Sequence, residues 1–280
     1  MGAKWAHRQH RVAGRYRTSV KLLRRTFVTV GPWRVHARVS AKRPKHEAPK
    51  VILVHGLGVS GRYLIPTAQE LAPDYPVYIP DLPGFGRSSR PREVLDIAGL
   101  ADALAAWMRV AKVGPGVLVG NSMGCQIITE FAIRHPQLAL AACFLGPTMD
   151  PQRPTALGQI LGLVRDHVKE GVALNLLAAY DYLSAGPART WKTFRYALAH
   201  RMEQRLPLVK APVLVVRGER DSIVTQRWAE QVAQLLPCAT LSVVPEYAHA
   251  INFNAAPQVA WLLRPFLEQC RNGLVADDAA

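Results

Sequence analysis

Short apolar runs recur along this 280-residue chain, and turn residues bound each of them. They are VILV at 51–54, VYI at 77–79, VLV at 117–119, ACFL at 142–145, PVLVVRG at 212–218 and ATLSVVP at 239–245. Apolar runs of this length are typical of strands buried on both faces of a parallel sheet. Between them, 94–112 and 123–135 carry apolar residues at helical spacing, which indicates βαβ crossovers. The rhythm predicts an α/β fold, with a mostly parallel twisted sheet flanked by helices.

Two segments depart from this rhythm. Residues 25–30 and 33–40 alternate apolar with polar around Gly31-Pro32, which predicts an antiparallel hairpin at the edge of the sheet. Residues 147–207 contain no strand-like run, and their pattern predicts helices over 155–171, 172–186 and 187–206. An all-helical insertion before the strand at 212–218 would lie above the carboxyl edge of the sheet, where open α/β sheets bind ligands. The insertion is therefore a candidate lid.

The net charge of +15 lies almost entirely at the start of the chain. Residues 1–50 hold 14 Lys and Arg against one acid, a charge of +13, whereas residues 51–280 hold 21 against 19, a charge of +2. A nearly neutral body does not present a basic face, so we expect no nucleic-acid partner. The basic head is expected to be a solvated or partly disordered extension, with weak contact to an anionic membrane as the alternative.

These observations divide the chain and favour a cytoplasmic protein. The expected parts are a basic extension at 1–25, a core at 26–146 and 208–270, a helical lid at 147–207 and a tail at 271–280. No apolar run follows the basic head as in a secretory signal, and none has the length of a membrane span. The four cysteines lack CxxC spacing, which favours buried free thiols. The location is therefore expected to be cytoplasmic or peripheral to a membrane, and the oligomeric state stays open.

A serine stands where strand pattern changes to helix pattern, in Gly120-Asn121-Ser122-Met123-Gly124. In such a sharp turn the serine hydroxyl is exposed, and the two glycines let strand and helix pass closely. The N–H of Met123 lies at the amino end of the helix, where partial positive charge favours an oxyanion. The site therefore predicts a nucleophile, although a βα turn with a capping serine has the same pattern.

A serine hydroxyl is a weak nucleophile, so a base must lie near it. Among the nine histidines, His249 follows the last apolar run and is expected at the same sheet edge as Ser122. Asp221 follows the run at 212–218, also at that edge, and is favoured as the carboxylate that orients the histidine. Glu219 and Asp150 are the alternatives for this role.

The chain order Ser122, Asp221, His249 resembles that of the α/β-hydrolase family. The sequence is also similar to that family in its His-Gly loop, His55-Gly56-Leu57-Gly58, and in DLPGFGRSS at 81–89, so that the resemblance covers residues 26–270. It implies that the Leu57 N–H is a second oxyanion donor beside that of Met123. It also implies that His55 holds its loop and that Asp81 anchors a turn.

By this resemblance we expect a serine esterase that transfers the acyl group of a small carboxylic ester to water. No dinucleotide fingerprint or metal-ligand cluster occurs in the sequence, and neither a cofactor nor a metal is expected. The alternatives are a lactonase, or a hydrolase of carbon–carbon bonds in ring-fission diketones, although Ala250 stands where the latter carry Trp. Relatives that hydrolyse epoxides or haloalkanes carry aspartate in place of Ser122. A receptor or scaffold of the same fold is the alternative outside enzymes.

Overall fold

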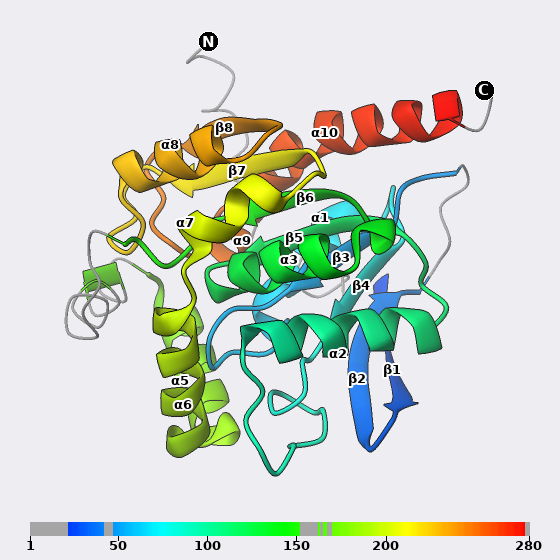
Figure 1. The fold of residues 1–280 in the computed structure, drawn as a ribbon. Coiled ribbons are helices and arrows are strands. Elements are labelled where there is room, and N and C mark those ends of the chain that lie inside the picture. The colour runs from blue at the N-terminus through cyan, green and yellow to red at the C-terminus, as the bar shows by residue number, and fades with distance from the viewer. Residues whose placement is uncertain (1–21, 42–46, 152–161, 163–164, 167–169, 278–280) are drawn as a thin grey trace.

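A computed structural model of the protein describes residues 22–41, 47–151, 162, 165–166 and 170–277. Eight strands form one sheet in the order β1-β2-β4-β3-β5-β6-β7-β8 (Figure 1). The β1–β2 and β2–β4 pairs are antiparallel and all other pairs are parallel. The mostly parallel sheet flanked by helices and the edge hairpin, both predicted from sequence, are confirmed.

The strands coincide closely with the apolar runs. Their bounds are β1 Leu23–Val30, β2 Trp33–Ser40, β3 Val51–Val54, β4 Val77–Pro80, β5 Gly116–Asn121, β6 Ala139–Leu145, β7 Val213–Gly218 and β8 Ala239–Val244. Every residue of β3, β5 and β7 is buried, because these strands lie inside the sheet with helices on both faces. The apolar runs therefore located the central strands to within three residues at each end.

Helices cover both faces of the sheet. Their bounds are α1 Ile65–Leu71, α2 Ile97–Val110, α3 Met123–Arg134, α5 Val172–Ala185, α6 Pro187–Ala199, α7 Met202–Arg205, α8 Gln226–Leu235, α9 Ile251–Asn254 and α10 Ala256–Asp277, with 3₁₀ turns at Gly61–Leu64, Pro136–Leu138 and Leu206–Leu208. None of the helices within the described ranges combines the length and the hydrophobicity needed to cross a bilayer.

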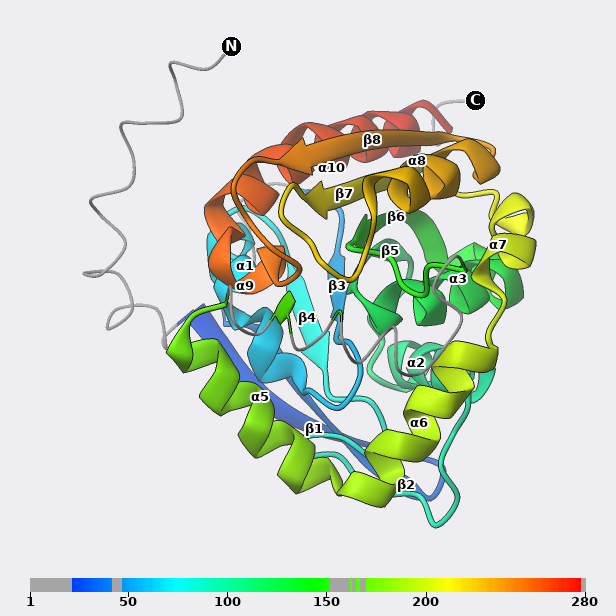
Figure 2. The ribbon, with the colours of Figure 1, turned by 90° about the vertical axis from the view of Figure 1, so that its left-hand side faces the viewer.

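Alternate strand residues supply two separate cores. Ile52 and Val54 of β3 pack into the core beneath α2, α3 and α8, whereas Val51 and Leu53 pack into the core beneath α1, α9 and α10. This alternation follows from the period of two along a strand. Figure 2 shows the two helical layers on either side of the sheet, with α5 and α6 beyond its edge.

The structure corrects the expected helices in two places. Residues 187–206 form two helices, because the chain turns at His200 and lets both His200 Nε2 and Arg205 Nε bond Glu130 of α3, at 3.0 and 2.7 Å. The last helix continues to Asp277 through the tail expected at 271–280, and Arg271 pairs with Glu268 one turn earlier at 2.6 Å.

Two other expected segments are the basic extension at 1–25 and the helix over 155–171. The first strand begins at Leu23, so it takes in the last residues of the segment assigned to the basic extension. Most of the helix expected over 155–171 lies outside the described residues.

Candidate active site

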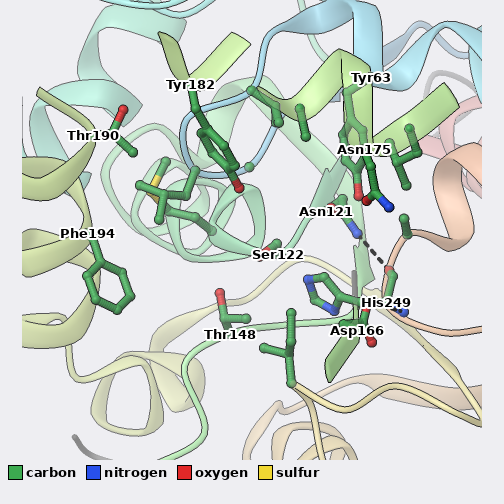
Figure 3. A pocket seen from close by; sticks show the side chains of 18 of the residues that line it. Tyr63, Asn121, Ser122, Thr148, Asp166, Asn175, Tyr182, Thr190, Phe194 and His249 are labelled. Carbon is green, nitrogen blue, oxygen red and sulfur yellow. Dashed lines mark hydrogen bonds between the residues drawn. The ribbon is translucent and has the colours of Figure 1, made fainter. Parts of the chain in front are cut away.

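The backbone at Ser122 adopts a conformation that few side chains accept. Its φ of 57° and ψ of −123° place a non-glycine residue at positive φ, between the end of β5 and the start of α3. The Ser122 N–H donates to the carbonyl of Leu145 at 3.0 Å, and its carbonyl accepts from Cys125 N–H at 2.9 Å. The turn is therefore fixed on both sides, and the serine side chain lines a cavity (Figure 3).

Two glycines make this turn sterically feasible. A Cβ on Gly124 would lie 2.5 Å from the carbonyl oxygen of Val54, and one on Gly120 would lie 2.6 Å from the Gly124 carbonyl carbon. Both contacts are with backbone, which cannot move aside as a flexible side chain can. The glycines thus allow α3 to begin directly against β3 and β5.

We expect Gly124→Ala to lower the free energy of unfolding by about 1–3 kcal/mol, because the added methyl forces α3 away from β3. Thermal unfolding followed by circular dichroism measures the change. Gly171→Ala is the matched control, since a Cβ there has no atom within 4 Å and its φ is −71°. Equal melting temperatures for the two variants would contradict the steric argument.

Asp221 and His249 form a buried pair at the carboxyl edge of the sheet. Asp221 Oδ2 lies 2.8 Å from His249 Nδ1, and Asp221 Oδ1 accepts from the N–H groups of Ile223 and Val224 at 2.8 Å each. The carboxylate is therefore oriented by the loop that follows β7. His249 Nε2 is buried and has no hydrogen-bond partner among the described residues. Because His249 and Ser122 line the same cavity, this nitrogen can accept a proton there.

The charges around His249 favour its protonated form. Burial by itself lowers the pKa of the imidazole, but the charge and hydrogen bond of Asp221, with the charges of Asp166 and Glu170, raise the pKa to about 9. A histidine in this setting is a stronger base than a free imidazole. It must lose its proton before it can accept one from a serine.

Asp166 and Glu170 brace the histidine loop and have no counterpart among the residues predicted from sequence. Asp166 Oδ2 accepts from His249 N–H and its Oδ1 accepts from Ser222 N–H, both at 3.1 Å, so one carboxylate joins the two loops. Glu170 Oε1 accepts from Ala250 N–H at 2.9 Å, and burial, followed by repulsion from Asp166, raises its pKa to about 7. In the sequence, Asp166 and Glu170 are four residues apart, which fits a helix but does not indicate a role at the site.

The alternative carboxylates have other partners. Glu219 Oε2 accepts from Glu246 N–H at 2.8 Å, and Asp150 Oδ2 accepts from Thr225 Oγ1 at 2.8 Å. The carboxylate that pairs with His249 Nδ1 is that of Asp221, the residue that the sequence favoured.

The His-Gly loop packs against the serine turn. A Cβ on Gly56 would lie 3.1 Å from the Asn121 carbonyl oxygen and 3.2 Å from the Ser122 Cβ, so the two loops touch. Within the described part of the chain, the N–H groups of Leu57 and Met123 form no hydrogen bond, and both residues line the cavity beside Ser122. They are thus available to a ligand oxygen.

His55 is buried and bonded within the scaffold. Its Nδ1 lies 2.9 Å from the Gly56 carbonyl oxygen and its Nε2 accepts from Leu82 N–H at 3.1 Å, while burial lowers its pKa. Asp81 accepts from Gly61 N–H at 2.8 Å and pairs with His36 at 2.8 Å. Both side chains hold loops together, and neither is among the residues that line the cavity.

Residues of the helices α5 and α6 line the cavity, and buried polar contacts tie these helices to the core. Asp181 of α5 accepts from the N–H and hydroxyl of Ser60 at 2.9 and 2.8 Å and pairs with Arg62. Tyr182 packs directly on Gly58, where φ is +70° and a Cβ would lie 2.1 Å from the tyrosine ring. Gly58 is therefore required by the approach of α5.

The cavity has a volume of about 430 Å³, and its walls are mainly apolar. The hydroxyls of Thr148 and Thr190 are buried in it without a partner among the described residues. Figure 3 shows Ser122 and His249 on one side of this space and Phe194, Thr190 and Tyr182 on the other. No group of His, Cys, Asp and Glu suited to a metal ion occurs within the described ranges.

Comparison with known proteins identifies the family of this chain. The model of the alpha/beta hydrolase family matches residues 51–260. The chain belongs to the alpha/beta hydrolase family. The match spans the turn at Ser122 and the loops that carry Asp221 and His249. It confirms the family, and the α/β-hydrolase enzyme, predicted from sequence.

Individual relatives are similar over most of their length. A pimeloyl-[acyl-carrier protein] methyl ester esterase of Neisseria meningitidis is 32% identical over 244 residues, which cover 78% of this chain and 93% of that protein. A poly(3-hydroxyalkanoate) depolymerase of Ectopseudomonas oleovorans is 26% identical over 85% of this chain and 91% of its own. The enol-lactonase of Burkholderia xenovorans LB400 shares the fold, with a TM-score of 0.74, 20% identity and coverage of 87% and 100%.

Proposed function

We propose that this α/β hydrolase cleaves small carboxylic esters through an acyl-enzyme, with Ser122 as nucleophile, His249 as base and Asp221 as the residue that orients the base. One observation carries the proposal. The Asp221–His249 hydrogen bond of 2.8 Å leaves His249 Nε2 without a partner in the described residues, at a cavity that Ser122 shares. The similarity to an ester-cleaving relative supports the choice of bond.

Each step follows from a group at the cavity. His249 accepts the Ser122 proton while the serine oxygen attacks the ester carbonyl, and the N–H groups of Leu57 and Met123 stabilise the oxyanion. The protonated histidine then donates to the leaving alcohol. Water, activated by the same histidine, releases the acid and restores the serine. Ser122, Gly120 and Gly124 form the turn, and His55, Gly56 and Gly58 form the supporting loop.

The cavity supports a substrate with an apolar acyl or alcohol part. Its walls are mainly apolar, and two threonine hydroxyls are available to polar atoms of a ligand. We propose that residues 147–207 are the lid of this site and that residues 26–146 and 208–270 are the catalytic core. A panel of p-nitrophenyl esters of increasing acyl length, with an acyl lactone and a ring-fission diketone beside it, tests the choice. Faster turnover of the lactone or the diketone than of every ester would overturn the ester assignment.

We expect kcat/KM for a neutral ester to rise with pH up to about 9, because His249 must lose its proton to act as base. Asp166 accepts hydrogen bonds from the N–H groups of His249 and Ser222, and Asp166→Asn removes its negative charge. The apparent pKa of His249 in the pH–rate profile should therefore fall. Initial rates between about pH 6 and pH 10, with the rate of Ser122→Ala subtracted, measure the apparent pKa of the parent and that of Asp166→Asn. Asp102→Asn, which alters a surface carboxylate bonded to Arg134, is the control. A rate that falls over this range would contradict the assignment of the base.

A further inference from the structure

The outward face of α5 carries apolar side chains and no charge. Val172, Leu176, Tyr180 and Leu183 follow one another at intervals of three or four residues and are 60–76% exposed. The single charged residue of the helix, Asp181, is buried against Ser60 and Arg62. A surface helix normally turns polar residues to water, and a continuous apolar face marks a contact with a partner.

This face continues into the mouth of the cavity. Leu183 belongs to the exposed face and also lines the cavity, as do Pro187 and Trp191 at the start of α6. Figure 2 shows α5 and α6 at the rim of the molecule, beyond the edge of the sheet. A partner that covers α5 therefore also meets the entrance to the site.

Basic residues adjoin the apolar face. The charged residues of α6 are Arg189, Lys192 and Arg195, all of them positive, and the last two are exposed. The side chain of Arg90 reaches the end of α5, where it donates to the Ser184 carbonyl. Two copies of this surface facing each other would bring like charges together, which disfavours a second copy as the occupant. The surface instead matches an apolar layer bordered by negative charge.

We propose that the outer face of α5, with Trp191 and the basic residues of α6, docks on the surface of a bilayer that contains anionic lipids. The helix lies in the plane of the interface, with Val172 and Leu176 among the acyl chains. Tyr180 and Trp191 lie at the depth of the headgroups, and Lys192 and Arg195 meet lipid phosphates. If the proposed function holds, an ester dissolved in the bilayer enters the cavity directly from the membrane.

The test compares full-length variants on vesicles. Co-sedimentation with vesicles of equal parts phosphatidylcholine and phosphatidylglycerol measures the partition coefficient. Val172→Gln/Leu176→Gln is expected to lower the coefficient at least about tenfold, because two apolar side chains no longer leave water. Lys192→Gln/Arg195→Gln is expected to lower it about tenfold on these vesicles and to have no effect on pure phosphatidylcholine.

The matched control is Val110→Gln/Trp261→Gln, which alters two exposed apolar residues on α2 and α10 and should bind as the parent does. The basic residues of 1–25 are present in every variant, so they cannot account for a difference. Turnover of p-nitrophenyl acetate in solution should be unchanged in the α5 variant, because Val172 and Leu176 do not line the cavity.

Three results would overturn the proposal. They are no binding of the parent to either vesicle, equal binding by the α5 variant and its control, or a dimer of the parent that the α5 variant converts to monomer. The same assay on Ser122→Ala should give the binding of the parent. A failure of the esterase assignment would therefore leave the vesicle result standing, and the two proposals can fail separately.

Discussion

Ser122→Ala should lower the turnover of short p-nitrophenyl esters at least about 10³-fold, because the proposed mechanism forms its acyl-enzyme on the Ser122 hydroxyl. The residual rate would come from the N–H groups of Leu57 and Met123 and from binding alone. Steady-state kinetics measures the loss, and the change should fall on kcat while KM stays near that of the parent.

Two controls separate chemistry from folding. The Ser122 side chain is partly exposed to the cavity and its backbone N–H bonds Leu145, so removal of the hydroxyl should leave the melting temperature nearly unchanged. The double variant Ser122→Ala/His249→Ala should be no slower than Ser122→Ala, because the two residues act as one unit. A Ser122→Ala enzyme that keeps its full rate would overturn the proposed mechanism.

Asp221→Asn should lower kcat about 10³- to 10⁴-fold, because the amide cannot hold His249 with its proton on Nδ1 and Nε2 free to accept. The pKa of His249 should fall at the same time. Its raised value depends on the Asp221 charge, and without that charge the lowering effect of burial has less opposition. Kinetics measures the rate, and NMR titration of the His249 ring measures the pKa.

Glu219→Gln is the matched control for this loss. Glu219 follows the same strand as Asp221 but accepts a hydrogen bond from Glu246 N–H. The neutral glutamine should therefore change kcat by no more than about twofold and leave the pKa of His249 unchanged. If Glu219→Gln lost as much activity as Asp221→Asn, the assignment of the orienting carboxylate would be wrong.

The sequence was sufficient for the sheet and for the placement of three candidate residues. Buried parallel strands are continuous apolar runs, and the carboxyl ends of such strands meet at one edge. Sequence pattern alone therefore predicts that Ser122, Asp221 and His249 lie together. In the folded chain, Asp221 Oδ2 lies 2.8 Å from His249 Nδ1. Local pattern and topology agree at this edge of the sheet.

Contacts between distant segments could not be read in the same way. The helix α1 was not predicted, because its seven residues are too few to show a helical period. The break between α6 and α7 depends on Glu130, a residue about 70 positions earlier that His200 and Arg205 both reach. The contact of Asp166 with the histidine loop could not be predicted for the same reason. Asp166 accepts from the N–H groups of His249 and Ser222, and these three residues come together only in the folded chain.

The anchoring of α5 and α6 has a consequence for substrate selection. Asp181 ties α5 to Ser60 and Arg62, while α6 is joined to the core where Gln126 Nε2 donates to the Ala197 carbonyl at 2.9 Å and Arg189 to the Pro91 carbonyl at 2.7 Å. Swinging these helices aside would break the hydrogen bonds of Ser60 to Asp181 and the Asp181–Arg62 ion pair. We therefore expect the entrance to change little when a substrate binds, so that substrates should be sorted by cross-section, with branched acyl groups penalised more than long straight ones.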